Sequence, residues 1–276
     1  MRRHELSDAE WELVQPLLPR PTMERPRLDD RTVLNGIIWK FRTGVAWRDV
    51  PERYGSWATL HTRFRRWASD GTFERMLRAA QAKADAAGSI DWLVSVDSTV
   101  VRAHQHAAGA RKKGAPDQAL GRSRGGLTSK IHLVVDGFGR PLAFVVTAGN
   151  INDCTQLTTV MDAIRVPRIG PGRPRIRPDH LLGDKGYSSK AIRTWLRQRR
   201  ITHTIPERAD QVANRQRGGR KGGRPPVFDK QLYKQRNVVE RCFNRLKQWR
   251  GLATRYDKTA MSYRAAVTLA SLLMWA

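Results

Sequence analysis

The sequence predicts an α/β domain preceded by a small all-α domain, and three observations lead to this fold class. The first 90 residues or so carry apolar side chains at helical spacing, interrupted by capping residues. From Asp91 onward, short apolar runs typical of strands replace that pattern. These runs alternate with helical segments in the order strand, hairpin, helix, strand, helix, strand, helix, which is typical of a sheet covered by helices. We therefore place the domains at residues 1–88 and 89–276.

The first two helices are marked by their caps. Ser7 and Glu10 form a capping box for a helix that Pro16 soon ends. A second helix is expected to begin near Asp30 and to stop at Gly44, because a glycine readily adopts the left-handed conformation that closes a helix.

The third helix begins after Ser56, and Gly71 ends it before Thr72 caps a fourth. Its inward side is expected to carry Trp57, Leu60, Phe64 and Trp67. Its outward side is expected to carry Arg63, Arg65 and Arg66. Residues 47–70 could form a helix-turn-helix in which these arginines contact DNA. The alternative is an ordinary helical bundle whose arginines are only solvated.

The second domain is predicted from its apolar runs. Strands are expected at Trp92–Val96, Ser129–Val135, Pro141–Thr147, His180–Gly183 and Ile201–Ile205. The Asp136-Gly137 pair favours a hairpin between the second and third of these strands. Helices are expected near Asp153–Ile164 and Ser188–Arg199, and again toward the end of the chain.

Two segments of this domain, 102–126 and 206–230, are rich in Gly, Arg, Lys and Pro, and we predict basic loops there. The second loop includes Arg220 and Lys221, which are candidates for phosphate contacts. A disordered surface loop in the free protein is the alternative, and it is compatible with ordering on DNA.

The charge of the chain indicates a polyanionic partner. Lys and Arg number 51 against 25 Asp and Glu, a formal net charge of +26. Such an excess disfavours the compact state unless a polyanion neutralises it, so nucleic acid is the expected partner. Only two cysteines are present, and the polar N-terminus does not resemble a secretory signal. The apolar stretch 265–276 is too short to cross a bilayer. We expect a cytoplasmic protein with no membrane role.

Two acidic residues follow predicted buried strands, and packing alone gains nothing from a carboxylate there. Asp97 closes the run Ser95-Val96, and Asp184 closes Leu181-Leu182-Gly183. Carboxylate oxygens are the ligands that Mg²⁺ prefers, and phosphodiester chemistry uses such ions on the attacking and leaving oxygens. A turn or helix-capping role is the alternative for each aspartate taken alone.

A third carboxylate, Glu240, lies in a predicted helix with two distinct sides. At about 100° per residue, Tyr233, Arg236, Glu240 and Lys247 share one narrow stripe. The opposite side carries Val238, Val239, Cys242, Phe243, Leu246 and Trp249. A solvated charge stripe is the alternative. One acid between two cations and a phenol is better suited to a metal ligand beside DNA phosphates.

Other polar groups receive structural roles. Asp136 is expected in a turn, Asn152 at a helix cap, His132 in packing and Cys242 in the core. His104 and His106 are interpreted as loop residues or DNA contacts rather than metal ligands.

These motifs resemble the DDE transposases of bacterial insertion sequences, in the branch with a Tyr-x2-Arg-x3-Glu-x6-Lys signature. Tyr233, Arg236, Glu240 and Lys247 match that spacing without a gap. The second-aspartate motif is matched by Asp184-Lys-Gly-Tyr187, and the first by Val96-Asp97-Ser98. The segments 4–11 and 47–51 also look like the leader domain of that branch, so the resemblance covers nearly the whole chain.

The resemblance implies an RNase H-like catalytic domain in which Asp97, Asp184 and Glu240 hold two Mg²⁺ or Mn²⁺ ions. It further implies cleavage at the ends of a mobile element and transfer of 3′-hydroxyls into target DNA. Double-stranded DNA would be the partner, contacted at the element end by Tyr233, Arg236 and Lys247. Pairing of two ends implies at least a homodimer. Either Trp195 or Trp249 would hold a flipped base if a hairpin intermediate forms.

Two rival functions remain open at this point. A nuclease of the same fold would cut DNA without joining it. A basic DNA-binding protein or an inactive transposase remnant would bind DNA without any chemistry.

Overall fold

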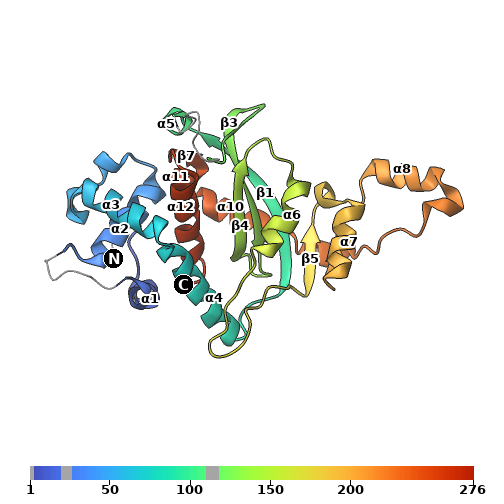
Figure 1. Ribbon diagram of the computed structural model, residues 1–276, viewed down its shortest axis with the longest axis horizontal. Helices are drawn as coiled ribbons and strands as arrows, with labels where there is room; N and C mark the ends of the chain where they lie inside the picture. The colour runs from blue at the N-terminus through green and yellow to red at the C-terminus, as the bar shows by residue number, and fades with distance from the viewer. Residues whose placement is uncertain (1–2, 20–26, 110–117) are drawn as a thin grey trace.

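The computed structural model describes residues 3–19, 27–109 and 118–276. In Figure 1 the N-terminal helices lie on the left, a mixed sheet occupies the centre, and helix α8 projects from the right-hand end. Throughout these described ranges, the helices are too short or too polar to span a membrane.

The N-terminal helices begin and end where their capping residues predict. Ser7 and Glu10 form the expected capping box at the start of α1. Gly44 closes α2 with a φ of 76°, in the left-handed region. The four helices of this region are α1 (Asp8–Val14), α2 (Asp30–Thr43), α3 (Trp57–Ser69) and α4 (Thr72–Ala86).

Three expectations around α3 are wrong in detail. Trp57 does not face inward, since it is 39% exposed in the first turn of α3. Arg63 does not face outward, because its guanidinium forms an ion pair with Asp30 of α2 and its side chain is only 12% exposed. Thr72 does not cap α4 but is its first residue, after the N-cap Gly71, and its N–H donates to the Asp70 carboxylate at 2.9 Å.

The segment before α3 consists of two short 3-10 turns, Trp47–Asp49 and Glu52–Tyr54. These turns connect α2 to α3, so an ordinary first helix of a helix-turn-helix is not found between residues 47 and 56. Arg65 and Arg66 are exposed on α3, as expected.

The sheet has the strand order expected of an RNase H-like domain. Its strands are β1 (Leu93–Ala103), β2 (Gly121–Ser123), β3 (Gly126–Val135), β4 (Pro141–Ala148), β5 (His180–Gly183), β6 (Thr202–Thr204) and β7 (Thr254–Arg255). The long strands β1, β3 and β4 form an antiparallel meander. β5 and β6 add to the other edge of β1 in parallel. The predicted hairpin between β3 and β4 is confirmed, and Asp136 accepts main-chain N–H groups within its turn.

The first strand is much longer than predicted. Asp97 does not end β1, because the strand continues for six more residues to Ala103. Pairing with β3 runs without interruption from Ser95 to Arg102, so the polar sequence after Asp97 is held by the ladder. The predicted loop at 102–126 is accordingly wrong in part: it contains the end of β1, the short helix α5 (Gln105–Ala108) and β2. Residues 110–117 of that loop lie outside the described residues.

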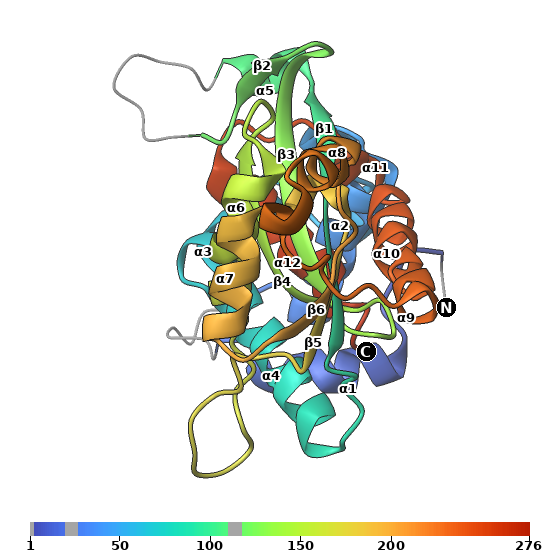
Figure 2. The same cartoon turned by 90° about the vertical axis from the view of Figure 1, so that its right-hand side faces the viewer.

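Helices cover both faces of the sheet (Figure 1, Figure 2). On one face, α6 (Asp153–Asp162) and α7 (Lys190–Gln198) bury apolar side chains against β1 and β5. On the other, α10 (Asn237–Lys247), α11 (Arg250–Ala253) and α12 (Ala260–Leu272) pack between the sheet and the N-terminal helices. One continuous core joins the N-terminal helices to this second face. The boundary at residue 88 therefore stays a prediction.

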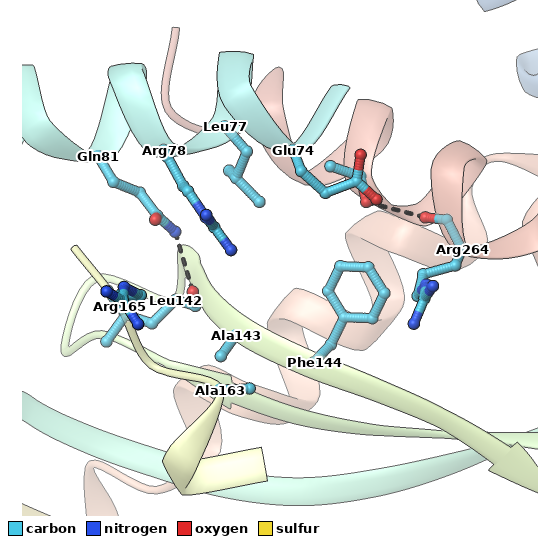
Figure 3. A pocket seen from close by; sticks show the side chains of 11 residues that line it. Glu74, Leu77, Arg78, Gln81, Leu142, Ala143, Phe144, Ala163, Arg165 and Arg264 are labelled. Atoms are coloured by element: carbon cyan, nitrogen blue, oxygen red, sulfur yellow. Dashed lines mark hydrogen bonds between the residues drawn. The ribbon is translucent and has the colours of Figure 1, made fainter. Parts of the chain in front are cut away.

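Polar contacts also join the two regions. Gln81 of α4 donates from its side-chain amide to the carbonyl oxygens of Pro141 and Leu142, at 3.1 and 3.0 Å (Figure 3). A cavity of about 300 Å³ lies beside this contact, between α4, β4 and α12. Arg78, Arg165 and Arg264 reach its lining from three different segments (Figure 3).

The basic segment 206–230 is not a structureless loop. It contains α8 (Ala209–Arg217) and a 3-10 turn at Gly219–Gly222, which together form a projecting arm. No residue of α8 is buried, so the arm has no core of its own. Side-chain hydrogen bonds of Gln211 with Ser188 attach it to the body of the protein.

The predicted single helix over 233–247 is divided in two. A turn at Gln235 and Arg236 separates α9 (Lys230–Lys234) from α10. The apolar side of α10 is confirmed, with Val238, Val239, Cys242, Phe243 and Leu246 buried. Cys242 is 1% exposed, as expected of a core residue.

The buried His132 predicts a pH dependence of stability. Its ring is 1% exposed, and burial lowers its pKa to about 4 despite the nearby Asp153 carboxylate. In the unfolded chain the His132 ring takes up a proton near pH 6.5, whereas in the folded protein it does so only near pH 4. The contribution of the neutral ring to the free energy of unfolding is therefore fully present above pH 6.5 and is lost as the pH falls toward 4. We expect a loss of up to about 3 kcal/mol. Urea unfolding at pH 7 and pH 4.5 should show a smaller loss in His132→Gln than in the wild type; equal losses would contradict this role.

Candidate active site

Asp97 lies in the middle of β1 on the face that α10 covers. Its neighbours on that face include Val101 and the register partner Leu133, both in the core shared with α10. The carboxylate accepts the Ser98 N–H at 2.7 Å and an Arg236 N–H at 2.8 Å. Burial raises the pKa of Asp97, an effect that these hydrogen bonds oppose. Asp97 is therefore a mostly buried acid at the centre of the sheet.

Asp184 follows β5 directly and lies beside Asp97 because of the sheet register. The parallel pairing places Gly183 opposite Val96, so the next residue on each strand is one of the two aspartates. The Asp184 side chain accepts the Gly186 N–H at 2.9 Å, which fixes the tight turn after β5. Its negative charge contributes to the raised pKa of Asp97. Two carboxylates are thus adjacent at one place in the sheet.

Glu240 reaches the same place from the first turn of α10. Its side chain is 52% exposed and forms an ion pair with the Arg236 guanidinium. The same guanidinium binds Asp97, so Arg236 bridges the first and the third predicted acids. The turn before α10 makes this possible, because Arg236 lies just outside the helix and four residues from Glu240.

The three acids have the chemistry of ligands for a divalent ion, although their side chains are not gathered around one point. Across the described ranges, no three Asp, Glu, His or Cys side chains are already gathered closely enough to hold an ion. The donors themselves are the hard oxygen ligands that Mg²⁺ and Mn²⁺ prefer. A guanidinium between Asp97 and Glu240 also shows that a cation is favourable at this place. The residues fit a divalent ion, provided that Arg236 turns away from at least one carboxylate.

A buried phenol beside the acids was not predicted as a site residue. Tyr187 is 1% exposed, and its hydroxyl has no hydrogen-bond partner among the described residues. Burial raises its pKa above the ordinary range, and the charges of Asp97, Asp153 and Asp184 add to this effect. The only signal in the sequence is its place at the end of the Asp-Lys-Gly-Tyr motif.

Asp153 also belongs to this neighbourhood rather than only to a helix cap. Asn152 does cap α6 as predicted, since its side chain accepts the Cys154 N–H. Asp153 instead pairs with Lys130 of β3 at 3.0 Å and lies 3.7 Å from the ring of His132. Asp153 thus joins α6 to β3.

The structure separates the predicted DNA-contacting residues into three places. Tyr233 packs against Phe228 with ring centroids 5.1 Å apart and planes tilted by 54°, and the Arg236 guanidinium lies 5.9 Å from its ring. Lys247 is exposed in the last turn of α10. Arg220 and Lys221 are exposed at the tip of the arm, and Arg65 and Arg66 are exposed on α3, at the opposite end of the molecule in Figure 1. Arg63 is engaged with Asp30, as described above.

The two tryptophans proposed as base-holding residues differ in access. Trp249 is 1% exposed inside the core that joins the two regions, so it has no free ring face for a base. Trp195 is half-buried on α7, with the Arg199 guanidinium 4.1 Å from its ring centroid.

Comparisons with known proteins agree with this architecture. Residues 88–275 match the family described as "Transposase DDE domain". Residues 6–77 match a second family, described as "Putative transposase of IS4/5 family". The two matches meet between residues 77 and 88, near the predicted boundary.

Among curated proteins, the chain is similar to several insertion-element proteins. It is 32% identical over 209 residues to the "Putative transposase for insertion sequence element IS402" of Burkholderia cepacia, covering 76% of this chain and 89% of that protein. It is 30% identical over 149 residues to the corresponding protein of element IS6501 of Brucella ovis, covering 54% of this chain and 98% of that protein. An uncharacterised Sinorhizobium fredii protein, y4sN, is 40% identical over 39% of this chain and 83% of its own length.

A chain of the Mos1 transposase paired-end complex is 11% identical and overlaps 84% of this chain and 82% of its own length, with a TM-score of 0.26. That score is too low to carry an argument, so the fold assignment depends on the strand order and the family match. The family match spans most of the chain and the IS402 relative spans three quarters of it. This protein belongs to the DDE transposases of bacterial insertion sequences.

Proposed function

We propose that this transposase cuts DNA at the ends of an insertion element and joins the 3′-hydroxyl ends to target DNA, with Asp97, Asp184 and Glu240 as its catalytic residues. The observation that carries the proposal is the placement of the three acids: the register of β1 and β5 puts Asp184 next to Asp97, and Arg236 joins Asp97 to Glu240 of α10. Packing does not explain this placement, because each carboxylate is costly to desolvate.

The three carboxylates would hold divalent ions, Mg²⁺ or Mn²⁺, as two ions per site. Bound ions of this kind activate the attacking hydroxyl and stabilise the leaving oxygen of a phosphodiester. Asp97 is fixed by its pairing with Leu133 of β3, directly after the last residue of β1 that pairs with β5, so it would provide the rigid ligand. Glu240 is half-exposed on α10 and would complete the ligand set from the solvent side.

Arg236 would have two successive roles. In the structure its guanidinium forms ion pairs with both Asp97 and Glu240. If ions occupied the carboxylates, the same guanidinium would be released and could bind a DNA phosphate through paired N–H groups. Tyr233 and Lys247 would contact the DNA end on either side of it. This arrangement keeps the acids paired in the absence of DNA.

The DNA would extend beyond the site along basic surfaces at both ends of the molecule. The arm with Arg220 and Lys221 would bind phosphates near one end, and Arg65 and Arg66 of α3 would do so near the other. Two element ends would be joined by at least two copies of the chain.

The proposal is tested with purified protein, Mg²⁺ and a plasmid that carries the gene with its flanking DNA. We expect nicks and joined products at the element ends with the wild type and none with Glu240→Gln, which keeps the shape but removes the charge. Cutting without joining by the wild type would indicate a nuclease. Salt-sensitive binding by both proteins, with cutting by neither, would indicate a DNA-binding protein without chemistry.

The arm predicts a defined salt dependence. Each phosphate contact contributes roughly 0.9 to the slope of log K against log [salt]. Replacing both Arg220 and Lys221 by Gln should therefore reduce that slope by about 1.8. The slope is measured by titrating the protein into fluorescently labelled DNA at several salt concentrations and following the fluorescence anisotropy of the DNA. Arg199→Gln is the matched control, because Arg199 is paired with Asp162 and should leave the slope unchanged. A double variant with the wild-type slope would exclude the arm from the DNA interface.

A further inference from the structure

A pocket of about 340 Å³ opens between the N-terminal helices and the far end of β1, away from the candidate acids. Its lining combines residues from distant parts of the sequence: Lys40, Trp47, His104, Tyr256 and Asp257. Pockets of this size commonly hold small planar ligands. The catalytic proposal assigns no role to any of these side chains.

The walls of the pocket are largely aromatic. The rings of His104 and Tyr256 lie 4.8 Å apart, and both are half-buried. Trp47 forms another part of the lining and contacts the rings of Phe41 and Phe64 behind it. Ring faces held in this way can stack against a planar heterocycle.

The pocket also contains two oppositely charged groups that do not bond to each other. Lys40 is 3% exposed, and its ammonium lies 4.0 Å from the centroid of the Phe41 ring and 5.4 Å from that of Trp47, without a hydrogen bond to any described residue. The Oδ2 atom of Asp257 is buried and also lacks a hydrogen-bond partner among the described residues. Burial lowers the pKa of Lys40 and raises that of Asp257, and each charge opposes the effect on the other.

The Lys40 ammonium and the Asp257 carboxylate provide a hydrogen-bond donor and acceptor inside an aromatic pocket, and this arrangement matches the edge of a nucleobase. An exocyclic amino group would donate to Asp257, and a ring nitrogen or carbonyl oxygen would accept from Lys40. A phosphate alone would satisfy Lys40 but would meet the Asp257 carboxylate with like charge. We propose that this pocket binds one unpaired nucleobase of the DNA on which the transposase acts, stacked against the aromatic lining of the pocket.

The place of the pocket suggests which part of the DNA provides that base. His104 follows β1 directly, seven residues beyond Asp97, a separation of about 20 Å along the strand. Asp97 and the N-terminal helices that form the pocket lie on the same face of the sheet. The base would therefore come from a position several nucleotides from the bond that is cut. This inference rests on the proposed function, since it requires the protein to bind DNA.

The experiment uses the full-length protein and two DNA duplexes that differ in one place. One duplex is fully paired, and the other carries a single unpaired 2-aminopurine, whose fluorescence reports stacking and whose edge has an amino donor beside a ring nitrogen acceptor. We expect tighter binding of the second duplex and a change in its fluorescence on binding. Tyr256→Leu should weaken binding of the second duplex about 5- to 100-fold and leave binding of the first unchanged.

Two further variants separate stacking from a loss of structure. Tyr256→Phe keeps the ring and should still prefer the duplex with the unpaired 2-aminopurine. Asp257→Asn keeps the shape of the side chain but removes its charge, and this variant should prefer that duplex less strongly than the wild type does. Trp57→Leu, at an exposed ring on α3, is the matched control and should behave as the wild type.

Equal affinity of the wild type for both duplexes would overturn the pocket proposal while leaving the proposed function intact. A preference that survives in Tyr256→Leu would overturn it as well. If the wild type binds neither duplex, the proposed function itself fails, and the pocket proposal fails with it.

Discussion

Asp97→Asn is expected to reduce DNA cleavage by about a thousandfold or more, with little change in DNA affinity. Asp97 is more enclosed than Glu240, with 24% of its side chain exposed against 52%, and it is paired with β3 and bonded to Arg236. The amide keeps the volume and can still accept a hydrogen bond from Arg236, so the sheet should not be disturbed. What the amide cannot provide is a negative oxygen for a divalent ion. Single-turnover cleavage of a labelled element end measures the effect.

The matched control for this variant is Asp162→Asn, at the end of α6. Asp162 is exposed and pairs only with the exposed Arg199, so the same chemical change there should alter cleavage by less than twofold. Wild-type cleavage by Asp97→Asn would remove Asp97 from the proposed ligand set. A variant that neither cuts nor binds DNA would indicate that the substitution damages the fold, and thermal unfolding would show this.

Arg255→Met is expected to destabilise the protein by about 3–5 kcal/mol, the largest stability effect that the structure predicts. Arg255 is fully buried where β7 pairs with the end of β1. Its guanidinium donates to the Ser129 hydroxyl at 2.6 Å and to three main-chain carbonyl oxygens, those of Ala119, Asp257 and Lys258. Methionine fills a similar volume but removes the donor to the carbonyl oxygens of Asp257 and Lys258, and leaves the Ala119 carbonyl with the Ser129 hydroxyl.

Urea unfolding at neutral pH measures this loss as a shift of the midpoint at constant slope. Arg102→Met provides the control, because Arg102 is exposed on the same strand and should change stability by less than about 0.5 kcal/mol. An Arg255 variant as stable as this control would show that the buried guanidinium contributes nothing net to folding.

The sequence predicts most of this fold because local signals agree with the tertiary structure. The capping box at Ser7, the Gly44 helix end and the Asp-Gly hairpin each depend on neighbours within a few residues. The three acids were also predicted from the residues, Asp97 and Asp184 from the apolar runs they follow and Glu240 from its helical stripe, and the family resemblance implied the same order along the chain. Their roles as catalytic ligands remain a proposal.

The errors have a common physical cause, which is long-range pairing. β1 continues past Asp97 because β3 and β7 supply hydrogen-bond partners that no local pattern reveals. Arg63 is drawn inward by Asp30, which lies 33 residues earlier. The helix in the arm forms although its residues bury nothing, so an apolar periodicity was never present to predict it. A single sequence also does not show that polar side chains such as Tyr187 and Asp257 are buried.

A change of ligand atom tests most directly whether the three acids hold the ions needed to cut and join DNA. Asp184→Cys replaces a hard oxygen by a thiolate, which binds Mg²⁺ poorly and softer ions such as Mn²⁺ better. Strand transfer of an element end should be lost in Mg²⁺ and regained at least in part in Mn²⁺, whereas the wild type should be active in both. Equal activity of Asp184→Cys and the wild type in Mg²⁺ would contradict the account.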